Sequence, residues 1–407
     1  MFVKLYFLLI ILFTSNILLS QNIDTDSKFN GNYLVRLAQL KKQPDGFAKF
    51  QELGKIYQQT GNYNKAIASY NKALSYDTIL KIQRDLAKCY EANGNKGKAL
   101  KVYQNIVKED SLGYLDLYKL GRLYAKLEQK KEALSIFKKL EKIDMTNPNY
   151  PYQIALNTDD IYRKADAFLR AYKADSLHAK SIYQLALFFK MIHDKDSSKL
   201  FLEKGLQVRP NSPAFLKLKI ADLYKKKAFQ EVLRYAKKLD TIVVNDIFAK
   251  QRIGLSYWKL KEYDSAKAYL KKAIKIDRAE KISYYYLGLV YKDLKEYEAA
   301  KMYFYLAIFK DKPNVDNEYY NLGIIAQEEK KPKEAIKNFK KAFENNDRNY
   351  KALFELAVMS DLYYKDKEIG YKYYEKYIDR FENKNPENTK YAIKRMKELK
   401  EKAFFEK

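Results

Sequence analysis

The chain has 407 residues, of which 47% are hydrophobic and 15% aromatic, so its composition allows a large buried core and excludes a disordered chain. Only 13 glycines and 8 prolines occur, and this scarcity of breakers favours helices. Lysine and arginine number 78 against 51 aspartates and glutamates, a formal net charge of +27. Lysine, tyrosine, asparagine and isoleucine, all with AT-rich codons, are abundant, so we interpret much of this excess as charge on solvated helix faces rather than as a binding patch.

Residues 1–20 have the three parts of a secretory signal peptide. Lys4 supplies the positive start, residues 5–13 form an apolar run, and Ser20 is a small residue suited to cleavage. The apolar run is shorter than the roughly 20 residues of a membrane-spanning helix. We therefore expect export to the periplasm or cell surface, with no stable membrane insertion after cleavage. The alternative is an uncleaved N-terminal anchor.

From residue 47 to residue 381 one pattern returns every 31 to 35 residues. A leucine or isoleucine precedes a small residue, and a tyrosine often follows three positions after that small residue. A second small residue stands about twelve positions after the first one. Small residues let two helices approach closely, and apolar residues three and four apart form a buried stripe, so each period predicts a helix hairpin. The first small residues are Gly54, Ala87, Gly121, Ala155, Ala186, Ala221, Gly254, Gly288, Gly323 and Ala357.

The pattern resembles the tetratricopeptide repeat, most clearly in residues 47–80, 247–280 and 281–315. The resemblance covers ten repeats within 47–381, of which repeats 4, 6 and 10 depart most from the family pattern. It implies an all-α fold, a right-handed superhelical solenoid of about ten helix hairpins with capping helices. A pentatricopeptide array, which would suit a basic RNA-binding protein, fits less well, because the small residue at the first-helix centre and the Gly-Asn-Tyr turn are tetratricopeptide features.

The segments on either side of the array, 21–46 and 382–407, are predicted to hold capping helices. One face of each helix is apolar: Tyr33, Leu37 and Leu40 in the first, and Ala392, Met396, Leu399 and Ala403 in the second. The alternative for the basic C-terminal segment is an amphipathic helix on a membrane surface.

The sequence contains no candidate catalytic, cofactor-binding or metal-binding constellation. His193 shares a polar turn with Asp194 and Asp196, which we interpret as a solvated turn rather than a metal site. Cys89 is the only cysteine, so no intramolecular disulfide can form, and we interpret it as a small buried residue of a helix. We therefore predict a protein that is not an enzyme and has no cofactor.

The family resemblance implies a concave groove lined by the first helix of each repeat, with binding positions three before, one after and four after the small residue. These positions are basic in repeats 1–3 and mostly aromatic or aliphatic later; in repeat 6, counted from Ala221, they include Leu218 and Asp222. Whether the tyrosines face the groove or pack between helices stays open. The candidate partner-binding residues are Lys55, Arg84, Lys88, Tyr118, Arg122, Tyr152, Tyr183, Trp258, Tyr285, Tyr320 and Phe354.

Trp258, the only tryptophan, stands four positions after Gly254, where we expect it to be partly exposed in the groove. The leading hypothesis is a non-catalytic scaffold of the cell envelope that binds an extended peptide or a helix of a protein partner there. The alternative is an accessory protein that binds carbohydrate or an acidic polymer through the basic strip and the tyrosine faces. A third hypothesis is a cytosolic regulator. Nucleic acid is not expected as a partner.

Overall fold

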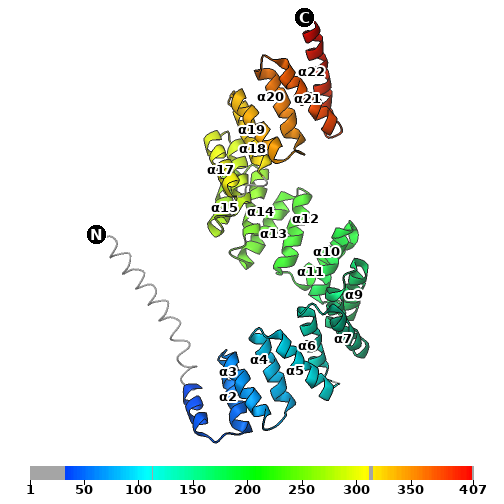
Figure 1. Ribbon diagram of the computed structural model, residues 1–407. Coiled ribbons are helices and arrows are strands. Elements are labelled where there is room, and N and C mark those ends of the chain that lie inside the picture. The colour runs from blue at the N-terminus through cyan, green and yellow to red at the C-terminus, as the bar shows by residue number, and fades with distance from the viewer. Residues whose placement is uncertain (1–32, 112, 311–314, 406–407) are drawn as a thin grey trace, which may run out of the picture. The chain divides into compact units, whose positions relative to one another are not determined.

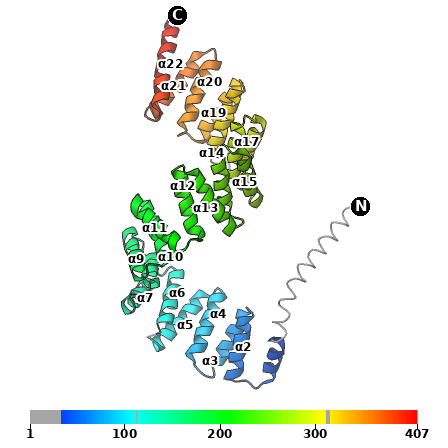
Figure 2. The same cartoon turned by 180° about the vertical axis from the view of Figure 1, so that it is seen from behind.

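The computed structural model describes residues 33–111, 113–310 and 315–405, and the predicted signal peptide lies outside these ranges. Within them every regular element is a helix, and successive helices form hairpins (Figures 1 and 2). The chain divides into two compact units, residues 1–201 and 202–407, with the boundary inside α11 (Lys195–Val208). None of the helices in the described ranges combines the length and the apolar character that crossing a membrane requires.

Unit 1 begins with a helix over residues 33–42 and continues with consecutive hairpins. The two helices of a hairpin pack on each other, and the second helix also packs on the first helix of the next hairpin. The helices are α2 (Phe47–Gln59), α3 (Tyr63–Leu74), α4 (Leu80–Ala92), α5 (Lys96–Glu109), α6 (Tyr114–Lys126), α7 (Lys130–Ile143), α8 (Asn149–Asn157), α9 (Ile161–Ala174) and α10 (Ala179–Met191).

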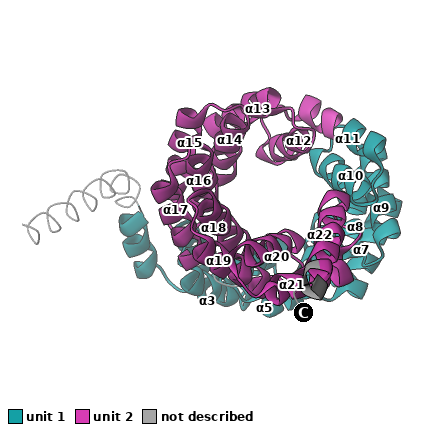
Figure 3. Cartoon of the chain, turned by 90° about the horizontal axis from the view of Figure 1, so that it is seen from above, with its two compact units in different colours: residues 1–201 teal, residues 202–407 magenta. Residues whose placement is uncertain are grey.

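Unit 2 repeats this packing. Seen from above, α14, α16 and α18 follow its inner side and α15, α17 and α19 its outer side (Figure 3). The inner helices also contact one another, α14 with α12 and α16, and α16 with α18. The helices are α12 (Pro213–Lys225), α13 (Phe229–Ile242), α14 (Ile247–Lys259), α15 (Tyr263–Ile276), α16 (Lys281–Asp293), α17 (Tyr297–Lys310), α18 (Asp316–Glu328), α19 (Pro332–Asn345), α20 (Tyr350–Tyr363), α21 (Lys367–Phe381) and α22 (Pro386–Phe405).

In most hairpins the small residue of the first helix makes room for a large side chain sixteen residues later, on the second helix. A Cβ atom added to Gly288 would lie 2.6 Å from the ring of Phe304, and one added to Gly323 would lie 2.5 Å from Phe339. Both rings are fully buried. The helices of a hairpin therefore touch through a large side chain packed on bare backbone, which explains why the sequence repeats a small residue there.

The turn inside most hairpins contains one residue in the left-handed backbone region, seven positions after the small residue. Gly61 (φ 72°) and Gly94 (φ 78°) adopt it without steric strain. The following Asn62 then caps α3, because its side chain accepts a hydrogen bond from the Lys65 N–H. In later hairpins the left-handed residues are Glu128, His193, Lys227, Lys261, Lys295 and Lys330.

This turn corrects the register of repeat 6. Counting back seven positions from Lys227 gives Ile220, which is fully buried, whereas Ala221 is only half-buried. A large Ile220 is accommodated because the residue sixteen positions later is the small Ala236, so the large and small partners have exchanged helices. The prediction that counted from Ala221 was therefore wrong by one residue, and Lys217 replaces Leu218 at the position three before.

Repeats 4 and 10 depart from the common turn, and neither contains a left-handed residue among those described. In repeat 4, α8 has only nine residues, and Asp160 caps α9 by accepting from the Arg163 N–H at 2.8 Å. Its second helix therefore begins early. In repeat 10 the turn passes through an extended Tyr364 and Asp366 before α21.

Helices at both ends cover the exposed apolar faces of the terminal hairpins. In the helix over 33–42, Leu40 is buried, and Tyr33 and Leu37 pack on the core formed with α2 and α3. In α22, Ala392 and Leu399 are buried against α20 and α21, with Met396 packed beside them. These capping helices cover the apolar surface that the first and last hairpins would otherwise expose to water.

Candidate functional site

The basic side chains predicted in repeats 1–3, which we call the basic strip, are mostly paired with carboxylates of their own unit. They are Lys55, Arg84, Lys88 and Arg122. Arg122 is the exception: it is exposed and forms no ion pair with a described residue. The strip therefore has less free positive charge than its sequence indicated. Its surface ion pairs are Lys55 with Glu52 at 4.0 Å and Lys88 with Asp85 at 2.7 Å.

Arg84 joins two neighbouring first helices rather than standing free. Its Nε donates to Asp116 at 2.7 Å, and its terminal nitrogen donates to Asp110 at 3.2 Å. Asp116 is almost fully buried, and its hydrogen bond to Arg84 is the main cause that raises the pKa of the guanidinium. A ligand at this position would have to compete with a buried carboxylate, so Arg84 is a structural residue.

The tyrosines three before the small residue are half-buried in unit 1. Tyr118 packs edge-on against Phe137 with ring centroids 5.8 Å apart, and its hydroxyl accepts from Gln153 at 3.4 Å. Tyr152 packs on Phe168 at 5.6 Å, and burial raises the pKa of its hydroxyl. Tyr183, the next member of the row, is also half-buried.

In unit 2, aromatic residues occupy the same register position on α16, α18 and α20. Tyr285 lies 5.9 Å from Phe304, and Tyr320 lies 5.8 Å from Phe339. Burial raises the pKa of both Tyr285 and Tyr320 to about 12. We call Tyr285, Tyr320 and Phe354 the aromatic row; Phe354 packs on Tyr377 at 5.4 Å. Each ring therefore packs against the core on one side and is partly exposed on the other. The tyrosines thus pack between helices and also keep some accessible surface.

The position one after the small residue is mainly structural in the middle of unit 2. Leu255 and Leu289 are buried, and Leu289 packs in one core cluster with Leu322 and Ile325 of the next first helix. Ile324 and Val358 are half-buried. The accessible apolar surface of the first helices thus comes more from the aromatic row than from these aliphatic residues.

Trp258 is partly exposed, as predicted, but its polar end is not free. Its Nε1 donates to Asp293 of the next first helix at 2.8 Å, and the Lys259 ammonium lies 3.8 Å from the ring centroid. The ring also packs near Tyr286, with centroids 6.1 Å apart. Trp258 therefore links two repeats and still presents part of its surface to solvent.

Sequence reasoning missed the polar residues that link successive first helices. Asp116, Ser283 and Glu318 stand five positions before their small residues, and all three are buried. Ser283 accepts from Gln251 of the preceding repeat at 3.1 Å, and Glu318 pairs with Lys281 at 3.4 Å. The available signal was a polar residue inside an otherwise apolar stripe at the same offset in three repeats.

The histidine and cysteine positions are structural. His193 is the left-handed residue of its turn, and Asp194 caps α11 by accepting from the Ser197 N–H at 3.0 Å. Among the described residues no group of three or more histidine, cysteine, aspartate or glutamate side chains could hold a metal ion. Cys89 is fully buried, as predicted, and burial raises the pKa of its thiol to about 11.

A family model described as Tetratricopeptide repeat matches residues 50–78, 117–147, 249–280, 282–308 and 319–349. A second model with the same description matches residues 85–111. The matches fall on repeats 1, 2, 3, 7, 8 and 9. They leave out repeat 5 as well as repeats 4, 6 and 10, the three that depart most from the pattern. Among curated proteins no sequence matches the chain.

Solved structures also resemble the chain. The human IFIT1 dimer with PPP-AAAA is 15% identical, with 90% of this chain and 94% of that one covered and a TM-score of 0.46. Yeast Tom70 is 13% identical, with 93% and 95% covered and a TM-score of 0.45. The C-terminal part of a TPR repeat-containing protein from Cytophaga hutchinsonii is 17% identical, with 57% and 97% covered and a TM-score of 0.45.

Proposed function

Because the chain belongs to the tetratricopeptide repeat family, we propose that it is a non-catalytic scaffold for protein–protein interaction. An extended peptide or a helix of the partner lies along the inner first helices and contacts the aromatic row. The proposal locates this interaction in the cell envelope, at the periplasm or the cell surface, and its support is the signal peptide expected from the sequence.

The observation that carries the proposal is the aromatic row itself. Tyr285, Tyr320 and Phe354 stand at one register position of three successive first helices, and all are half-buried. Each ring is held by an aromatic contact with the second helix of its own repeat. A ring fixed in this way loses little conformational entropy on binding, and it offers both apolar surface and, in tyrosine, a hydroxyl.

Site-specific photocrosslinking tests the proposal. We expect Tyr285→benzoyl-phenylalanine and Tyr320→benzoyl-phenylalanine to capture the same protein from an envelope extract. The matched control is Ala268→benzoyl-phenylalanine, an exposed position of α15 on the outer side. Binding of that protein should also change the fluorescence of Trp258. Equal capture at all three positions, or a partner that leaves Trp258 fluorescence unchanged, would contradict binding along the inner helices.

The second candidate function is binding of an acidic polymer. The observation in its favour is Arg122, which is exposed and forms no ion pair within the part of the chain that the structure describes. A salt titration separates the two candidates, because exposed charges are screened by salt and apolar contacts are not. Binding that falls steeply with salt and is lost in Arg122→Ala would favour the polymer. Binding that resists salt and is lost in Tyr320→Ser favours the protein partner.

A further inference from the structure

We propose that unit 2 carries a second binding site on its outer side, for an acidic peptide segment with apolar side chains. The site is a cleft of about 490 Å³ beside α19, lined by tyrosines of three other helices and by lysines of α19 itself. None of the three residues of the aromatic row lines this cleft, and two of the helices that form it, α17 and α19, lie on the outer side of the unit (Figure 3). The residues that carry the argument are Tyr305, Tyr319, Tyr363, Lys333, Lys337 and Lys341.

The lysines give the cleft a positive wall. Lys333, Lys337 and Lys341 are spaced four apart, so they share one face of α19 over roughly 12 Å. Lys333 and Lys337 form no ion pair with a described residue, and the Lys341 ammonium lies 5.0 Å from the centroid of Tyr319. The N-terminal end of α19 adds further positive potential. Glu334 is the only acidic residue among those that line the cleft, so its field favours an anionic ligand.

An amide at the cleft can form hydrogen bonds with a ligand. Asn338 lines the cleft with 5% of its surface exposed, and an amide side chain both donates and accepts hydrogen bonds. The backbone of a bound peptide supplies both the N–H and the carbonyl that an amide needs.

An exposed apolar stripe on α17, which includes Tyr305 of the cleft, is the reason for choosing a peptide over a carbohydrate. Met302, Tyr305 and Phe309 recur at helical spacing on one face of α17, and they are 49%, 49% and 75% exposed. Apolar side chains of a peptide would cover this stripe, whereas an acidic sugar would leave Met302 and Phe309 in water. A membrane surface fits less well, because a flat bilayer would not fill a concave cleft.

The test uses the full chain and a fluorescein-labelled nonapeptide in which glutamate alternates with leucine, followed by fluorescence anisotropy. We expect Lys337→Glu to weaken binding about tenfold or more, since it replaces attraction by repulsion at the middle of the cleft. The matched control is Lys340→Glu, on the same helix but outside the cleft and paired only loosely with Glu344 at 3.9 Å. Glu334→Gln should tighten binding.

Four outcomes overturn the proposal. They are absence of binding, equal effects of Lys337→Glu and Lys340→Glu, equal binding of a nonapeptide in which lysine alternates with leucine, and Lys337-dependent binding of polygalacturonate or anionic vesicles in place of the acidic peptide. Tyr320→Ser, in the aromatic row, should leave the affinity for the nonapeptide unchanged. That variant therefore separates failure of this site from failure of the inner one.

Discussion

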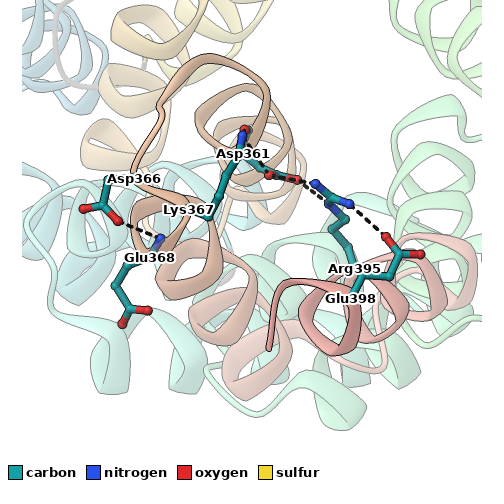
Figure 4. Close-up of polar contacts among 6 residues, drawn as sticks. All are labelled: Asp361, Asp366, Lys367, Glu368, Arg395 and Glu398. Carbon is teal, nitrogen blue, oxygen red and sulfur yellow. Dashed lines mark hydrogen bonds and ion pairs between the residues drawn. The ribbon is translucent and has the colours of Figure 1, made fainter. Parts of the chain in front are cut away.

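Arg395 of α22 holds the buried carboxylate of Asp361 on α20 through two hydrogen bonds, one from Nε at 2.6 Å and one from a terminal nitrogen at 3.2 Å (Figure 4). Lys367 lies 3.7 Å from the same carboxylate and donates to the backbone carbonyl of Asp361. Asp361 stands four positions after its small residue, as Glu91 and Trp258 do. All three are bonded to a residue of the following first helix or, for Asp361, of the capping helix.

We expect Arg395→Met to loosen α22, because it leaves the carboxylate of Asp361 buried with only Lys367 as a counter-ion. The free energy of local opening of α22 should fall by about 2–3 kcal/mol. Hydrogen exchange measured on peptides from α22 would report it. Lys397→Met is the matched control, since Lys397 is 80% exposed and its contact with Glu401 is 3.9 Å. Faster exchange of α22 in the control as well would show that the buried pair is not the cause.

Gly370 marks a close backbone approach between α20 and α21 in repeat 10. A Cβ atom there would lie 2.7 Å from both Cα and Cβ of Asp361 and 2.9 Å from its backbone nitrogen, and backbone cannot rotate aside as a side chain can. We expect Gly370→Ala to destabilise α20 and α21 by about 2–3 kcal/mol, in the range of overpacked cores. Thermal unfolding and hydrogen exchange of these helices would measure it.

Gly97→Ala is the same chemical change as Gly370→Ala, but we expect it to stabilise the protein rather than destabilise it. Gly97 lies in α5, and a Cβ atom added there meets nothing within 4 Å. Helix propensity alone should then stabilise the chain by up to about 1 kcal/mol. Similar destabilisation by both variants would indicate that the clash at Asp361 is relieved by other movements.

Much of the fold could be predicted from the sequence, because the hairpin is specified by short-range spacing. The small residue and the apolar stripe recur at fixed offsets, and the turn signals stand between them. Repeat 6 shows the limit: Ile220 and Ala236 exchange large and small, so the position is defined by complementary volumes and not by a small residue alone.

The candidate site was less predictable, for an electrostatic reason. The repeat register predicted that Arg84 and Trp258 lie at binding positions of their first helices. It could not predict that Asp116 and Asp293 of the next repeat accept hydrogen bonds from them. Those partners are 32 and 35 residues away, so no local pattern connects them. Tyr285 and Tyr320 show the same limit, because their half-burial depends on aromatic rings of the second helix.

The half-buried Tyr285 and Tyr320 should make the folded protein less stable at alkaline pH. Burial raises the pKa of Tyr285 and Tyr320 from 10 to about 12, so the folded state keeps its phenol protons where the unfolded state loses them. The stability that these residues contribute is therefore complete below pH 10 and is lost as the pH rises to about 12. Circular dichroism, with absorbance at 295 nm to follow phenolate formation, should show ionisation lagging and then accompanying unfolding. Tyrosines that ionise near pH 10 without loss of helix would contradict this.

The last prediction concerns the turns inside the hairpins, where several lysines adopt a left-handed backbone conformation that glycine adopts more easily. Lys261 has φ 63° in the turn between α14 and α15, at the position that Gly61 occupies in repeat 1. A left-handed conformation costs a residue with a Cβ atom about 1–2 kcal/mol, part of which glycine loses again through its greater unfolded entropy. Lys261→Gly should therefore stabilise repeat 7 by up to about 1 kcal/mol, measured by urea unfolding and by hydrogen exchange of α14 and α15.

Two controls fix the sign of that effect. Gly61→Ala should destabilise repeat 1, although nothing lies within 4 Å of the added Cβ atom, because only the backbone conformation opposes it. Lys271→Gly, at an exposed position inside α15, should destabilise the same repeat by about 1 kcal/mol through lost helix propensity. If Lys261→Gly lowered stability as Lys271→Gly does, the turn at Lys261 would not be strained, and the lysines at the equivalent turns would have to contribute a stabilising contact of their own.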